Sequence, residues 1–73
     1  MLVEIDARTI QGYGGEICWQ LDDGVHIVTV IDSDGTVQAI LQVSDGREAR
    51  ELFEHPFAVL TVPNLFARVA AAA

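Results

Sequence analysis

His26 and the aspartates expected around it are the first residues in this sequence whose types could do chemistry. Asp22 and Asp23 precede the strand that carries His26, and Asp45 is predicted at the same end of the sheet. An imidazole among carboxylates could bind a divalent metal. However, the spacing matches no recognised ligand pattern, and aspartates are common at turns and helix caps without any ligand. We therefore predict a histidine at the boundary of the core, with no metal and no cofactor.

Cys18 is the one cysteine of the chain, and beside a histidine it could act as a nucleophile. The strand register described below places Cys18 and His26 on opposite faces of a sheet, beyond the hydrogen-bond reach that a nucleophile and its base require. His55 is not placed by the sequence. A small, half-buried structural thiol is the preferred interpretation, and we predict that the protein is not an enzyme.

Two loops share a feature with ligand-binding motifs. The segment 12–15 is rich in glycine, but it joins two strands, whereas a phosphate-binding loop leads into a helix N-terminus. The segment 32–35 has aspartates like the start of a calcium loop and lacks the later glutamate. Both are predicted to be turns, with Tyr13 at the tip of the first as a candidate contact residue.

The charge balance limits the kinds of partner. Eleven acidic residues and four basic ones give a net charge of −7, which disfavours nucleic acid and anionic membranes as partners. The acidic residues could instead imitate a nucleic-acid backbone and block a basic site. Arg47 and Arg50 interrupt the acidic row on the predicted helix, so an ordinary solvated surface is the preferred interpretation.

The location of the protein is predicted from three absences in the sequence. A single cysteine cannot form an internal disulfide, which fits a reducing compartment. The first residues are acidic, unlike those of a signal peptide, and no apolar run approaches the ~20 residues that span a membrane. We therefore expect a cytoplasmic protein with no membrane partner.

The elements that position these residues centre on the run 25–31. Both of its alternating faces are apolar, so it is predicted to be a buried strand in the middle of a sheet. An Asp-Gly pair on each side indicates hairpin turns. Further strands are predicted at 3–11, 16–22 and 36–43. The predicted fold is a single α+β domain over residues 1–73, with a four-stranded antiparallel β-meander.

The turns also predict a register. If the pairs 23–24 and 34–35 are two-residue loops, Val28 lies opposite Trp19 on one side and Leu41 on the other. One face of the sheet is then almost wholly apolar and is expected to be the core: Ile17, Trp19, Leu21, His26, Val28, Val30, Val37, Ala39, Leu41 and Val43. The reverse face is mixed, with an apolar streak of four residues: Val25, Ile27, Ile31 and Ile40.

The second half of the chain is predicted to contribute helices. A helix over 45–54, with Asp45 and Glu48 in capping-box spacing and Ser44 as the alternative cap, is expected to cover the Trp19 face with an apolar stripe. Two i,i+4 pairs, Arg47 with Glu51 and Arg50 with Glu54, add support to it.

The last part of the sequence gives weaker signals. The apolar run 57–62 is a candidate fifth strand, and a short C-terminal helix is expected over 64–73. Leu65, Phe66 and Val69 would anchor this helix on the reverse face of the sheet or on a neighbouring subunit.

The functional prediction is based on surplus apolar surface. Hydrophobic residues make up 51% of the chain, and a chain this short has little interior in which to bury them, although alanines inflate the count. The preferred prediction is a small acidic, non-catalytic protein-interaction module, such as an inhibitor or accessory factor. The alternative is a structural subunit of a homo-oligomer or larger assembly, including a virion component. The candidate interface residues are Val25, Ile27, Ile31, Ile40, Tyr13, Leu65, Phe66 and Val69.

Overall fold

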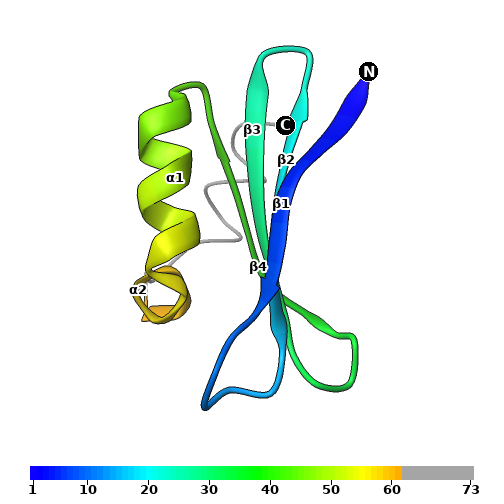
Figure 1. Cartoon of the computed structure of the whole chain (residues 1–73), viewed down its shortest axis with the longest axis vertical. Coiled ribbons are helices and arrows are strands. Elements are labelled where there is room, and N and C mark those ends of the chain that lie inside the picture. The colour runs from blue at the N-terminus through cyan, green and yellow to red at the C-terminus, as the bar shows by residue number, and fades with distance from the viewer. Residues whose placement is uncertain (62–73) are drawn as a thin grey trace.

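The computed structural model describes residues 1–61 and consists of one antiparallel sheet with two helices on one of its faces (Figure 1). The strands follow one another across the sheet in chain order: β1 (Leu2–Thr9), β2 (Glu16–Asp22), β3 (Val25–Ile31) and β4 (Val37–Val43). The helices are α1 (Gly46–Glu54) and α2 (Pro56–Thr61). The predicted α+β class and four-stranded meander are confirmed, with β3 as an interior strand.

The hairpin between β2 and β3 forms as predicted. Asp23 and Gly24 both have positive φ, at 50° and 82°, which is the geometry of a two-residue type I′ turn. The turn fixes the pairing, with Trp19 opposite Val28 and Leu21 opposite His26. The register predicted from the Asp-Gly pair is therefore confirmed across β2 and β3.

The turn between β3 and β4 is longer than predicted. The Gly35 N–H donates to the Asp32 carbonyl at 3.0 Å, and the Asp32 N–H donates to the Thr36 carbonyl at 3.0 Å. This leaves a three-residue loop that ends on Gly35, whose φ is 83°. The Asp32 carboxylate stabilises the loop by accepting hydrogen bonds from the backbone of Asp34 and Thr36. The predicted two-residue loop at 34–35 is wrong.

A second irregularity restores the register beyond this loop. Ile31 lies opposite Val37, while Val30 lies opposite Ala39, so Gln38 is an extra residue in β4. The predicted pairing of Val28 with Leu41 is kept. Val37 was expected in the core, but it is 41% exposed.

The core lies between the sheet and the helices. Asp45 caps α1 by accepting a hydrogen bond from the Arg47 N–H at 2.9 Å, which confirms the predicted start of this helix. Ala49 and Phe53 of α1 are buried against the sheet. The buried hydrophobic residues are Ile10, Ile17, Val28, Val30, Ala39, Leu41, Val43, Ala49, Phe53 and Val59.

The prediction of a fifth strand at 57–62 is wrong, because the described part of this segment belongs to helix α2. Pro56 occupies the first helical position, where its fixed φ and missing N–H cause no loss. His55 joins the two helices: its N–H donates to the Leu52 carbonyl, and its own carbonyl accepts from Val59. Val59 is fully buried, whereas Phe57 is 51% exposed. In a strand these two side chains would share a face.

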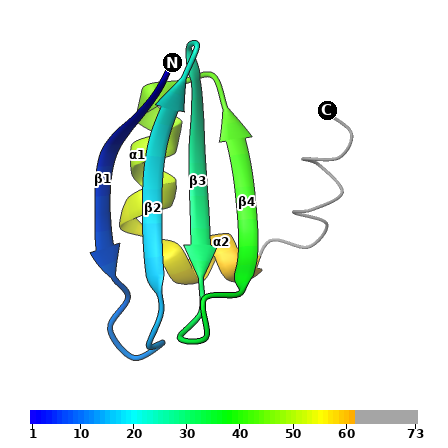
Figure 2. The same cartoon turned by 90° about the vertical axis from the view of Figure 1, so that its right-hand side faces the viewer.

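Strand β1 is more exposed than its alternating sequence predicts. All eight of its residues are exposed, including Val3 at 49% and Ile5 at 42%. Helix α1 packs mainly on β2, β3 and β4, and β1 is an edge strand of the sheet (Figure 2). The strand ends at Thr9, before the predicted end near residue 11, because Ile10 turns into the core.

The loop from β1 to β2 approaches the backbone at the end of β3 closely at Gly15. A Cβ on Gly15 would collide with the Ile31 carbonyl oxygen, so only glycine fits there. The predicted helix over 64–73, with Leu65, Phe66 and Val69, lies outside the described residues.

Candidate functional site

The apolar streak of the reverse face lies on the side of the sheet opposite the helices. Ile40 is paired with Thr29, which places it between Ile27 and Ile31 on the same face. These three isoleucines are half-buried, and Val25 at the end of β3 is exposed. Both helices lie behind the sheet in Figure 2, so within residues 1–61 no helix covers the streak. We call this surface the open face.

Tyr13 lies apart from the open face. Its ring meets the ring of Phe57 edge-on, with centroids 6.3 Å apart and an interplanar angle of 88°. Tyr13 is half-buried and packs against the core cluster. The structure therefore brings together four of the predicted interface residues and places Tyr13 against α2.

Cys18 and His26 lie on opposite faces of the sheet, as the register requires. Cys18 is paired with Thr29 and belongs to the open face, whereas His26 is paired with Leu21 on the helix side. Burial, together with the negative charges of Glu16 and Glu4, raises the pKa of the Cys18 thiol. A raised pKa disfavours the thiolate, which is the nucleophilic form of cysteine.

His26 has a structural partner. The Trp19 Nε1–H donates to His26 Nδ1 at 3.0 Å, so this nitrogen acts as an acceptor and its lone pair is already used. The aspartates predicted nearby have other roles: Asp22 and Asp23 lie within 3.3 Å and 3.1 Å of the Met1 amino group, and Asp45 caps α1. Across residues 1–61 no group of three His, Cys, Asp or Glu side chains could hold a metal.

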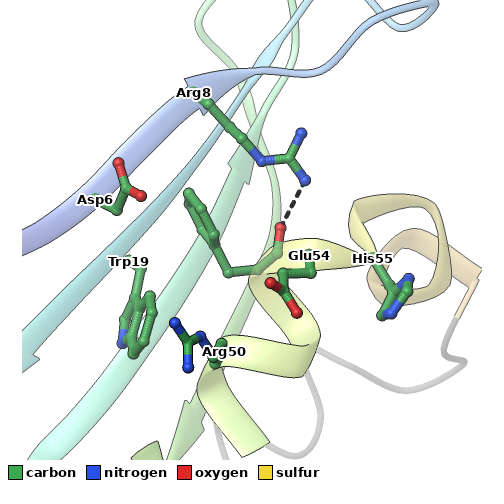
Figure 3. A pocket seen from close by; sticks show the side chains of 7 residues that line it. Asp6, Arg8, Trp19, Arg50, Glu54 and His55 are labelled. Atoms are coloured by element: carbon green, nitrogen blue, oxygen red, sulfur yellow. Dashed lines mark hydrogen bonds between the residues drawn. The ribbon is translucent and has the colours of Figure 1, made fainter. Parts of the chain in front are cut away.

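A groove between β1 and α1 was not predicted from the sequence. One hollow has a volume of about 480 Å³. Figure 3 shows side chains that line it, with Trp19 on the sheet side and Arg50 and Glu54 on α1. A second hollow of about 540 Å³ extends towards the start of α1. The two share Asp6, Trp19 and Arg50 and form one groove. Its lining residues are Ile5, Asp6, Arg8, Trp19, Gly46, Arg47, Arg50, Phe53, Glu54 and His55.

A β-bulge at Ile5 turns charged side chains of β1 towards this groove. Glu4 pairs with Gln20 and Asp6 with Trp19, so Ile5 is an extra residue without a partner. Beyond the bulge, Asp6 and Arg8 lie opposite core-face residues of β2 and so point to the helix side. A strict alternation of Val3, Ile5 and Ala7 with polar residues would place Asp6 and Arg8 on the outer face, and the bulge is the reason that they lie on the helix side.

Arg8 links β1 to the end of α1. Its Nη2 donates to the Phe53 carbonyl at 2.9 Å, and its guanidinium carbon lies 5.2 Å from the centre of the Phe53 ring. The Phe53 ring in turn lies 5.8 Å from that of Trp19. The side chains of Arg8, Phe53 and Trp19 therefore form the floor and one end of the groove; Figure 3 labels Arg8 and Trp19.

The predicted i,i+4 ion pairs on α1 do not form. Among residues 1–61, the ion pairs shorter than 4 Å are those of the Met1 amino group. The guanidinium groups of Arg47 and Arg50 are therefore without a carboxylate partner in the described part of the chain, although Glu51 and Glu54 lie one turn further along α1.

Comparison of the chain with protein-family models, with curated protein sequences and with solved structures finds no match. None of the described helices is long and apolar enough to cross a membrane.

Proposed function

We propose that this protein is a small acidic, non-catalytic protein-interaction module of the inhibitor or accessory-factor type. The observation that carries the proposal is the apolar surface left in contact with solvent. Val25 on the open face and Leu2, Val3 and Ile5 along β1 are all exposed. On the open face, Val25 continues the streak of Ile27, Ile31 and Ile40, and an apolar patch of this kind on a small protein is typical of interaction sites.

The arrangement of the chemically reactive residues supports a binding role over catalysis. Cys18 and His26 lie on opposite faces of the sheet, so they cannot act together as nucleophile and base. The Trp19 indole already occupies the Nδ1 lone pair of His26. The net charge of −7 favours a protein partner over nucleic acid or an anionic membrane, and the single cysteine favours a cytoplasmic setting.

The test compares two neighbouring positions on the open face. Ile27 and Gln42 are opposite each other across β3 and β4, and Ile27→Gln removes apolar surface where the control Gln42→Ser does not. Native mass spectrometry of complexes recovered from the native cell should show the partner with Gln42→Ser and lose it with Ile27→Gln. Both variants should keep the thermal midpoint of the parent. A drop in that midpoint for Ile27→Gln alone would mean that the chain covers its own open face.

The second candidate function is a structural subunit of a homo-oligomer or larger assembly, such as a virion component. It is favoured by the two edges of the sheet: within residues 1–61, β1 and β4 each pair with one neighbouring strand, and unpaired edges can add further strands. Sedimentation velocity over a wide concentration range tests it. A mass that rises with concentration supports self-assembly, and a monomer at the highest attainable concentration contradicts it.

A further inference from the structure

The groove between β1 and α1 has a charge opposite to that of the whole molecule. The chain has only four basic residues, and three of them, Arg8, Arg47 and Arg50, line the groove. Two acidic residues line it as well, Asp6 and Glu54, which leaves a local excess of one positive charge. Such local fields attract ligands of the opposite sign even when the net charge of the protein is unfavourable.

The arginines have unused hydrogen-bonding capacity. Arg8 is held by the Phe53 carbonyl and ring, but a guanidinium has five N–H donors, and one bond uses only one of them. Arg47 and Arg50 have no side-chain acceptor within residues 1–61. Planar guanidinium groups bind carboxylates through two parallel hydrogen bonds, so these side chains indicate a carboxylate ligand.

The floor of the groove is aromatic. Trp19 is half-buried and its N–H is bonded to His26, so the ring surface is what the indole offers to a ligand. Ile5, released from pairing by the bulge, contributes aliphatic surface beside it. A ligand that fits this floor carries an apolar side chain next to its carboxylates.

We propose that this groove binds an acidic peptide segment of a partner protein. Carboxylates of the peptide pair with Arg47 and Arg50, an apolar side chain rests on Trp19, and its backbone N–H groups donate to Asp6 and Glu54. Helix α1 runs along the groove from Gly46 to Glu54 for about 13 Å, which matches about four extended residues. The two acidic residues of the lining disfavour a multiply charged phosphate ligand in the same place.

The site is separate from the open face, because it lies on the helix side of the sheet (Figures 2 and 3). The inference therefore goes beyond the proposed function, and it holds even if the open face proves to be covered by the chain itself.

The test uses a display library of random twelve-residue peptides selected on the intact chain. Enriched peptides should combine aspartate or glutamate with an aromatic or aliphatic residue. Trp19 is the only tryptophan in the sequence, so its fluorescence reports binding of tryptophan-free selected peptides directly. The same peptide with every acid replaced by its amide should bind at least tenfold more weakly.

Two matched variants locate the site. Arg50→Gln on the groove and Gln42→Glu on the open face each change the net charge by one negative unit. Arg50→Gln should lower the affinity for the selected peptide about threefold to fivefold, and the double variant with Arg47→Gln and Arg50→Gln about tenfold. Gln42→Glu should leave that affinity within twofold of the parent. Neither exposed arginine supports the core, so circular dichroism should show folded variants.

Three results would overturn the inference. They are a selection that enriches no peptide, one that enriches basic or neutral peptides, and acidic peptides that bind the double arginine variant as tightly as the parent. Loss of binding in Ile27→Gln with retention in the double arginine variant would move the site to the open face and also reject the groove.

Discussion

Arg8→Gln is the substitution that most directly tests the contact between β1 and α1. Strand β1 is at the edge of the sheet and α1 packs mainly on the other three strands, and Arg8 reaches the last turn of that helix from β1. The Arg8 guanidinium donates to the Phe53 carbonyl at 2.9 Å and lies over the Phe53 ring. The variant loses both contacts and keeps a polar side chain, so it should weaken the attachment of the strand to the helix.

The expected loss of stability in Arg8→Gln follows from these two contacts. A hydrogen bond in a partly exposed setting contributes about 1 kcal/mol to stability, and a cation–π contact at an exposed site contributes about 0.5 kcal/mol. The sum of about 1.5 kcal/mol corresponds to a fall in thermal midpoint of about 6–12 °C for a chain of this size. Arg8→Lys should recover part of the lost stability, because a lysine keeps the positive charge but lacks the planar guanidinium group.

The matched control is Arg47→Gln, which makes the same change in net charge at a side chain without a partner in the described residues. Thermal unfolding followed by circular dichroism should show Arg47→Gln within about 2 °C of the parent, since surface substitutions of this kind have small effects. Equal midpoints for Arg8→Gln and Arg47→Gln would refute the reasoning, because the effect of Arg8 would then be one of charge alone.

Three further tests, each with its own control, address other parts of the structure. Gly15→Ala should destabilise the chain by more than about 3 kcal/mol or prevent folding, because its Cβ meets the Ile31 carbonyl. At Gly12 the space is open but φ is 81°, so Gly12→Ala should lower the free energy of unfolding by only about 1–2 kcal/mol. Urea titration of both glycine variants measures the difference. Val59→Asp should unfold the chain and Phe57→Asp should not, as judged by far-ultraviolet circular dichroism, because only Val59 is buried. Equal effects would favour a strand over α2. Iodoacetamide should alkylate Cys18 more slowly in the folded chain than in urea at the same pH, because the pKa of this thiol is raised on folding. By linkage the folded state then binds more protons, so stability should fall as pH rises through the cysteine range, and Cys18→Ser should remove that part of the slope.

The two Asp-Gly pairs show which part of the fold the sequence determines. A type I′ turn at Asp23 and Gly24 permits one register, and that register gathers the apolar side chains of β2 and β3 on one face. At Asp34 and Gly35 the same sequence signal led to the wrong loop, because the Asp32 carboxylate accepts two backbone hydrogen bonds and stabilises a longer turn. The core register survived because Gln38 is accommodated as an extra residue.

Helix α2 shows a limit of periodicity as a signal. The run after Pro56 is short and apolar at almost every position, so a strand and a buried helix predict nearly the same pattern. The His55 carbonyl decides between them, since it accepts from the N–H groups of both Ala58 and Val59 and so starts a helical turn at Pro56. This hydrogen bonding depends on α1 ending one residue earlier, which is a property of the packed structure.

The groove and the exposed strand have one cause, the extra residue at Ile5. Without a bulge, alternation would place Val3, Ile5 and Ala7 together on the helix side and leave Asp6 and Arg8 outside. With the bulge, Val3 remains opposite Leu21 while Asp6 and Arg8 move to the helix side, where charged side chains occupy positions that a helix could otherwise have covered. The same irregularity that keeps α1 from packing on β1 therefore supplies the charged side of the groove, and a sequence pattern with a strict period of two cannot predict either.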